Sequence, residues 1–167
     1  MAINQYHLPM TIQFGYDKKQ VLQALRYHFL SKPEIKILVI LVNVFAIATA
    51  ILFAFKKIQG ISFLIFSFLW FSLMLTIWRI LPASIYKRAA TFQDHFSIRF
   101  EEEGVELSNQ HGAKAWPWTA FSSFMESPHF FHLYFDARSF FLVPKDAFKD
   151  INQLQAVRQL IREKISS

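Results

Sequence analysis

The stretch ILVILVNVFAIATAILFAF, residues 37–55, contains no charged side chain, and neither does a second stretch at residues 58–78. A helix needs about 20 apolar residues to cross the ~30 Å hydrocarbon core of a membrane, and both stretches are about that long. A surface helix of a soluble protein keeps a polar stripe, which neither stretch has. The KKIQG turn at residues 56–60 is short. The sequence therefore predicts an antiparallel transmembrane hairpin within residues 33–86, with spans at about 35–55 and 61–82.

Charge is distributed unevenly around this hairpin. The net charge of the chain is +6, and all of it lies in residues 1–86, because basic and acidic residues balance in residues 87–167. Only Lys56 and Lys57 lie in the turn, whereas more basic residues precede the first span and follow the second. Basic residues favour the cytoplasmic side, so we expect both termini in the cytoplasm and no cleavable signal peptide. A neutral tail also argues against a nucleic-acid partner.

Several residues of the hairpin are expected to bend it, to form hydrogen bonds within it or to lie at the membrane interface. Pro82 is expected to kink or end the second helix, and Asn43 either forms a hydrogen bond within the hairpin or belongs to a polar path. No ionisable group lies in the charge-free residues 37–55 or 58–78, which disfavours a transporter. The residues expected at the membrane interface are aromatic or basic: Trp78, Arg79, Tyr86, Lys87 and Arg88.

The sequence pattern of residues 1–32 predicts a strand followed by an amphipathic helix. PMTIQFGY alternates apolar and polar residues, the period of a strand. Asp17 stands where a helix N-cap is expected, with Gln20 three residues later. The sequence leaves open whether this helix lies on the membrane surface or packs on the tail.

Residues 87–167 predict an antiparallel β-domain closed by a helix. Short alternating segments such as DHFSIRF, HFFHLYF and FFLVP are separated by the turn signals EEEG, NQHG and DARS. Gly112 suits a positive φ in the second of these turns. Asp150 is a good N-cap for the last helix, whose apolar residues recur at helical spacing: Ile151, Leu154, Val157, Ile161 and Ile165.

The order of these motifs resembles a known family. EEEGVELSN is followed by WTAF, by FFLVPKDAF and by the closing helix, and over residues ~96–165 this resembles the YcxB-like family of bacterial membrane proteins. The resemblance implies a membrane α+β protein of the bacterial inner membrane: two transmembrane helices and a cytoplasmic pleckstrin-homology-like β-roll capped by the last helix. It brings no enzymatic activity. Phe121 stands where the family often has an aliphatic residue.

Four aromatic residues in the β-domain are candidates for its core or for a partner surface: Trp116, Trp118, Phe121 and Phe124. The resemblance implies that Trp118 begins a core strand. We expect Trp116 nearer the rim, where an exposed ring could also meet lipid headgroups. HFFHLYF or FFLVP is the candidate edge strand for pairing with a partner.

Few residues are candidates for catalysis or for binding a metal or cofactor. The chain lacks cysteine and has four glycines, which excludes thiolate sites and leaves little room for phosphate-cradling loops. His129 and His132 point to opposite faces of a strand, so no metal, cofactor or catalytic residue is predicted and the protein is not expected to be an enzyme. Lys145 and Lys149 are candidates for contact with anionic headgroups.

Three hypotheses about function follow. The first is a non-enzymatic inner-membrane protein whose β-domain binds a protein partner. The second is an immunity protein that neutralises a membrane-acting bacterial toxin through its spans. The third is a module that binds anionic lipid. The expected partners are thus the bilayer and a protein of unknown identity, such as a toxin or a second copy of the chain.

Overall fold

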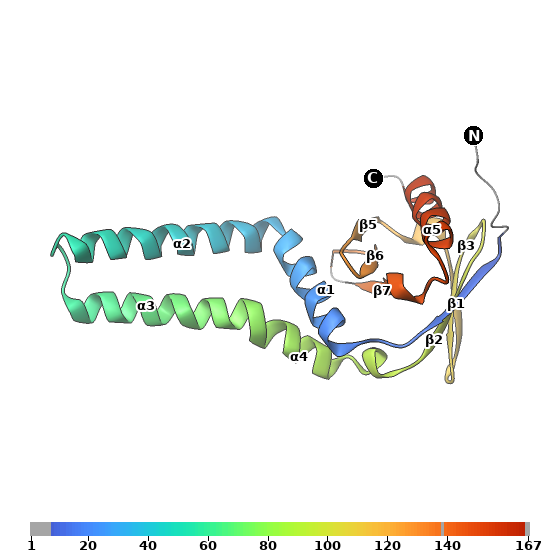
Figure 1. The fold of residues 1–167 in the computed structure, drawn as a ribbon, viewed down its shortest axis with the longest axis horizontal. Coiled ribbons are helices and arrows are strands. Elements are labelled where there is room, and N and C mark those ends of the chain that lie inside the picture. Colours follow the sequence, from blue (N-terminus) through green and yellow to red (C-terminus); the bar gives the residue numbers. More distant parts are fainter. Residues whose placement is uncertain (1–7, 138, 166–167) are drawn as a thin grey trace. The chain divides into compact units, whose positions relative to one another are not determined.

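The computed structural model describes residues 8–137 and 139–165 and shows an α+β protein with two antiparallel sheets and two long apolar helices (Figure 1). Contacts divide the chain into two compact units. One contains residues 1–20 and 90–167, which we call the sheet unit, and the other contains residues 21–89, which we call the hairpin unit. This division differs from the expected parts 1–32, 33–86 and 87–167, because the N-terminal strand belongs with the C-terminal sheets.

The described residues of the sheet unit form seven strands in two sheets. Sheet A has the order β1-β2-β3-β4 and sheet B the order β5-β6-β7. The strands of sheet A are β1 (Met10–Phe14), β2 (Phe96–Phe100), β3 (Gly104–Asn109) and β4 (Gly112–Pro117). Those of sheet B are β5 (Ser123–Glu126), β6 (Phe130–Tyr134) and β7 (Phe140–Pro144).

Strand β1 pairs with β2 across the whole intervening hairpin. Their antiparallel register places Met10 opposite Phe100 and Phe14 opposite Phe96. Both strands alternate buried apolar residues with more exposed ones, so the period of two fixes which face meets the core. The N-terminal strand therefore completes sheet A.

One hydrophobic core lies between the sheets and the last helix, α5 (Ile151–Lys164). Ile12, Phe100, Phe131 and Val157 contribute to it from four different elements. As expected, the Asp150 side chain caps α5 by accepting a hydrogen bond from the backbone N–H of Gln153 at 2.8 Å. The apolar stripe of the helix begins later than expected, because Ile151 is 62% exposed.

Two glycines are required by the backbone of sheet A. A Cβ at Gly104 would lie 2.2 Å from the carbonyl oxygen of Trp116 on the neighbouring strand, a distance no side chain tolerates. Gly112 has φ 147° in the β3–β4 turn, which confirms the expected positive φ.

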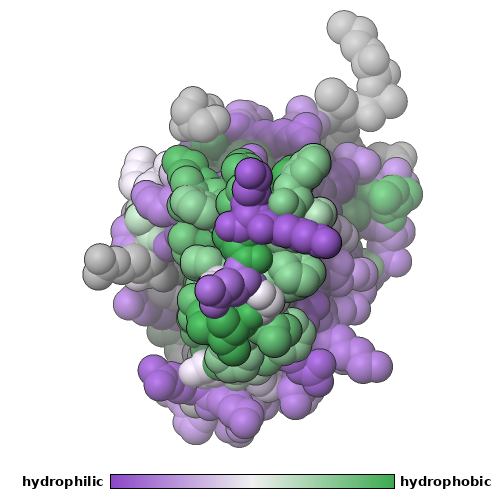
Figure 2. Space-filling model, turned by 90° about the vertical axis from the view of Figure 1, so that its left-hand side faces the viewer, coloured by the Kyte–Doolittle hydropathy of each residue, from purple (hydrophilic) through white to green (hydrophobic). Residues whose placement is uncertain are grey.

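The hairpin unit contains α2 (Pro33–Ala54) and α3 (Gly60–Leu75), which run side by side (Figure 1). Helix α3 continues through a π-helical turn, Thr76–Ile80, into α4 (Leu81–Arg88). In the most apolar window of each long helix only 6% of residues are buried. Figure 2 shows apolar side chains gathered over this unit. Both helices are long and apolar enough to cross a membrane.

Asn43 forms its hydrogen bonds within the hairpin. Asn43 donates from Nδ2 to the carbonyl oxygen of Val39 at 2.7 Å and accepts from Trp70 Nε1, on the other helix, at 3.4 Å. This geometry agrees with the interpretation of Asn43 as a hydrogen-bonding residue within the hairpin.

Pro82 kinks the helix without ending it. Proline has no N–H and clashes with the carbonyl of residue i−4, which here is Trp78. The π-helical turn absorbs the clash, since the N–H of Leu81 donates to the carbonyl of Thr76, five residues back. Helix α1 (Lys18–Ser31) supplies a replacement donor, because Arg26 Nε lies 2.9 Å from the freed Trp78 carbonyl.

We predict that Arg26→Ala lowers the stability of the protein by about 1 kcal/mol, because it removes a hydrogen bond to this carbonyl. Pro82→Ala restores an N–H at residue 82, so Arg26→Ala should cost less in a Pro82→Ala background. Thermal unfolding of the four chains in detergent measures this coupling. Effects that simply add would contradict the link between Arg26 and Pro82.

The β1–β2 pairing makes a second prediction. Residues 90–167 alone should not fold, because β2 would lose its neighbour and the core would lose Ile12 and Phe14. Joining residues 8–16 to residues 90–167 through a short flexible linker should restore the fold. Dispersion of amide NMR signals distinguishes the two chains. A well-dispersed spectrum from the shorter one would show that β1 is dispensable.

Candidate functional site

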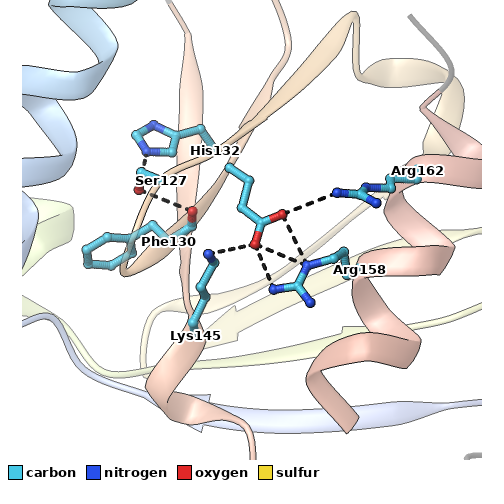
Figure 3. A network of polar contacts seen from close by, with 7 residues as sticks. Ser127, Phe130, His132, Lys145, Arg158 and Arg162 are labelled. Carbon is cyan, nitrogen blue, oxygen red and sulfur yellow. Dashed lines mark hydrogen bonds and ion pairs between the residues drawn. The ribbon is translucent and has the colours of Figure 1, made fainter. Parts of the chain in front are cut away.

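A cluster of charged side chains lies where sheet B meets α5 (Figure 3). Glu126 ends β5, Lys145 begins the 3₁₀ turn Lys145–Ala147 after β7, and Arg158 and Arg162 lie one turn apart on α5. We call these four residues the Glu126 cluster. Three elements distant in sequence thus contribute to one group of charges.

The Glu126 carboxylate forms ion pairs with all three cations of the cluster. Glu126 Oε1 lies 2.6 Å from Lys145 Nζ and 2.7 Å from an Arg158 terminal nitrogen. Arg158 Nε also lies 3.1 Å from Oε2, so two nitrogens of the guanidinium meet the two carboxylate oxygens, the two-pronged geometry that favours arginine with carboxylates. Arg162 is more distant, at 3.8 Å from Oε2.

The two closer cations also cover the core. The Lys145 ammonium lies 5.4 Å from the centre of the Phe131 ring, and the Arg158 guanidinium lies 5.8 Å from it. Phe131 is fully buried, and the side chains of Lys145 and Arg158 are only 16% and 18% exposed. The cluster therefore closes the core at this edge and fastens α5 to sheet B.

The pKa of the Glu126 carboxyl is held below its usual range. Its burial acts to raise the pKa, but the hydrogen bonds from Arg158 and Lys145 and their positive charges together outweigh that effect. Glu126 is therefore ionised at neutral pH and serves as a fixed anion rather than as an acid or base.

A second polar pair lies beside this cluster. His132 Nε2 and Ser127 Oγ are 3.0 Å apart, and Ser127 Oγ donates to the carbonyl of Phe130 at 3.2 Å. Ser127 is 4% exposed and His132 is fully buried, so a substrate in solution reaches neither atom. His132 is therefore a buried core residue, whereas His129 is exposed and lies outside the pair. No group of three metal-ligating side chains occurs in the described part of the chain.

The four aromatic candidates all belong to the core or pack against it. Trp118 is 4% exposed and donates from Nε1 to the carbonyl of Glu101 at 3.0 Å. Contrary to expectation it begins no strand, since it lies in the 3₁₀ turn Trp118–Ala120 after Pro117. Trp116 is half-buried and stacks near Phe135 and Phe141, while Phe121 is buried and Phe124 half-buried.

The expected edge strands are largely closed to a partner. HFFHLYF forms β6, which is paired on both sides, so its interpretation as an edge strand is wrong. FFLVP forms β7 and does lie at an edge, but the Tyr16 hydroxyl donates to the carbonyl of Leu142 in its middle at 2.8 Å.

The remaining candidates differ in exposure. Among the interface candidates, Trp78, Arg79, Lys87 and Arg88 are exposed and Tyr86 is half-buried. Lys149 is also exposed. Lys145 is not, because Glu126 and the Phe131 ring hold it.

Sequence reasoning missed Glu126, Arg158 and Arg162 as a group. Glu126 ends a short apolar segment, and nothing local identifies its partners. The i, i+4 spacing of the two arginines on α5 was the one signal that could have placed them on a common face.

We predict that Glu126→Gln destabilises the protein by about 1–3 kcal/mol at neutral pH, since it leaves two half-buried cations without their anion. Because the folded pKa is lowered, the stabilisation is present above the unfolded pKa of about 4.5 and is lost as pH falls through the folded value. Denaturant unfolding from pH 7 to pH 3 should show the two chains converging in acid.

Glu102→Gln, in the exposed turn before β3, provides a matched control and should change stability little at any pH. A constant difference between Glu126→Gln and the unaltered chain down to pH 3 would show that the ionised carboxylate is not what stabilises this edge.

The comparisons with known proteins concern the same region. No curated protein and no solved structure matches the chain. The family model for YcxB-like protein matches residues 100–161, from the end of β2 into α5, and thus includes the whole Glu126 cluster except Arg162. Residues 100–161 are therefore similar to a YcxB-like domain, as the motifs of the sequence indicated.

Proposed function

We propose that the protein is a membrane-anchored interaction module without enzymatic activity. In this proposal α2 and α3 span the bacterial inner membrane, and the sheet unit is a pleckstrin-homology-like domain on the cytoplasmic side. The observation that carries the proposal is the exposure of apolar side chains along both helices of the hairpin.

The cost of that exposure in water supports a lipid environment. Phe45, Leu64 and Phe68 are each more than 60% exposed, and many similar residues line the same helices. Leaving such a side chain in water rather than burying it costs about 1.5–3 kcal/mol. Summed over the hairpin, the cost exceeds the typical stability of a domain. A core helix of a soluble protein would be mostly buried, whereas these windows are 6% buried.

The strand pairing supports an even number of membrane crossings. The chain leaves the sheet unit after Phe14 and returns to it before Phe96, and these two residues face each other in the β1–β2 ladder. Two crossings bring the chain back to the side from which it started, as this pairing requires. The basic residues near the start of the first span and the end of the second favour the cytoplasmic side.

The arrangement of the sheet unit supports the comparison with a pleckstrin-homology domain. Sheets of four and three antiparallel strands share one core with a C-terminal helix. Its polar clusters hold the fold: Glu126 fastens α5, and Ser127 and His132 lie out of reach of solvent. We infer binding rather than catalysis for this domain.

The absence of cysteine from the sequence makes the topology directly testable. Gln59→Cys places a thiol in the hairpin turn and Glu102→Cys places one in the sheet unit, both at exposed positions. On intact spheroplasts, a membrane-impermeant maleimide should label Gln59→Cys, and it should label Glu102→Cys only after permeabilisation.

The unaltered chain controls for labelling of other groups, and lysed cells control for thiol reactivity. Labelling of Glu102→Cys in intact spheroplasts would refute the cytoplasmic placement. Extraction of the protein from membranes by alkaline carbonate would refute the integral anchor.

A further inference from the structure

The Glu126 cluster contains more positive charge than its carboxylate neutralises. Lys145, Arg158 and Arg162 contribute three positive charges around one anion, which leaves an excess of two. The ion pairs among the described residues give these three cations no second carboxylate. An excess of this kind in a partly buried site favours an anion from outside.

The need to fasten α5 does not explain Arg162. Arg158 and Lys145 already occupy both oxygens of Glu126 at 2.6–3.1 Å. Arg162 lies 3.8 Å away with 63% of its side chain exposed, and a pair of that kind contributes about 0–1 kcal/mol. Most of its five N–H donors therefore stay available to a ligand.

The other two cations are held in place before any ligand arrives. Lys145 and Arg158 are fixed between Glu126 and the Phe131 ring, so little side-chain entropy remains to be lost on binding. Figure 3 shows the three cationic side chains converging on the same carboxylate from the 3₁₀ turn and from α5. A ligand would meet Arg162 first, because it is the most exposed of the three.

The charge and the donors indicate the chemistry of the ligand. Two excess positive charges match a dianion, and guanidinium groups pair best with planar or tetrahedral oxyanions. A phosphate monoester carries close to two negative charges above its second pKa of about 6 and offers three acceptor oxygens.

We propose that Lys145, Arg158 and Arg162 form a binding site for a phosphate monoester group. The site deepens the proposed function by giving the interaction module a ligand class. It lies wholly within the sheet unit, so its failure would leave the membrane topology untouched, and a wrong topology would leave the site untouched. The monoester could belong to a soluble metabolite or to the headgroup of phosphatidic acid.

The test uses the full chain in nanodiscs of phosphatidylcholine. Calorimetric titration with glycerol 3-phosphate should show saturable binding with Kd below about 10 mM, and the affinity should rise several-fold from pH 5.5 to pH 7.5 as the monoester becomes a dianion. Arg162→Ala should weaken binding at least about tenfold. Its effect on folding is expected to be small because the side chain is exposed, and a thermal melt verifies this.

Lys114→Ala is the matched control, since Lys114 is an exposed cation on β4 that lies over the Trp116 ring. It removes the same charge and should leave binding unchanged. Two results would overturn the proposal: no binding by the unaltered chain at pH 7.5, or equal losses in Arg162→Ala and Lys114→Ala, which would indicate attraction by net charge alone.

Nanodisc composition distinguishes the two sources of the monoester. If the headgroup occupies the site, discs containing phosphatidic acid should suppress binding of glycerol 3-phosphate. Discs that carry the same total charge in the form of phosphatidylglycerol, a diester, should not suppress it. Unchanged binding in both kinds of disc would assign the site to a soluble phosphate monoester.

Discussion

The pairing of β1 with β2 is the constraint on which the rest of the structure depends. It joins residues 10–14 to residues 96–100 and so closes a loop of roughly 80 residues, which as a flexible chain would cost about 4 kcal/mol in entropy. The hairpin lowers that cost, because its antiparallel helices return the chain toward its starting point. Folding of the sheet unit therefore depends on the hairpin unit that connects β1 to β2, although each unit has its own contacts.

Single side chains that bond to backbone carbonyls secure the places where regular structure breaks. Arg26 donates to the Trp78 carbonyl, which Pro82 deprives of its usual donor. Trp118 donates to Glu101 where β4 gives way to a 3₁₀ turn. Tyr16 donates to Leu142 of β7 just after β1 ends, and its burial raises the pKa of the hydroxyl, which keeps the donor proton. Each bond satisfies a carbonyl that would otherwise depend on water.

The sequence predicted the features that local chemistry determines. The apolar runs, the caps at Asp17 and Asp150 and the turn at Gly112 all depend on residues a few positions apart, and the structure shows each of them. The pairing of strands distant in sequence could not be predicted. The alternation of apolar and polar residues shows which residues of a strand share a face, but it does not show which other strand is its neighbour in the sheet. For that reason β6 was mistaken for an edge, and the pairing of β1 with β2 was not predicted. The π-helical turn likewise depends on a donor from another helix.

The Glu126 cluster shows how a balanced composition conceals a charged site. Residues 87–167 contain equal numbers of acidic and basic residues, so the net charge of the segment indicates no ligand. Folding brings Arg158 to Glu126 from 32 positions away and adds Lys145 and Arg162, while other acidic residues, such as Glu102, lie exposed in turns. Local electrostatic potential depends on distances that are set only after the sheets and α5 assemble. A neutral domain can therefore present a site with two uncompensated positive charges, and its ligand follows from that local charge.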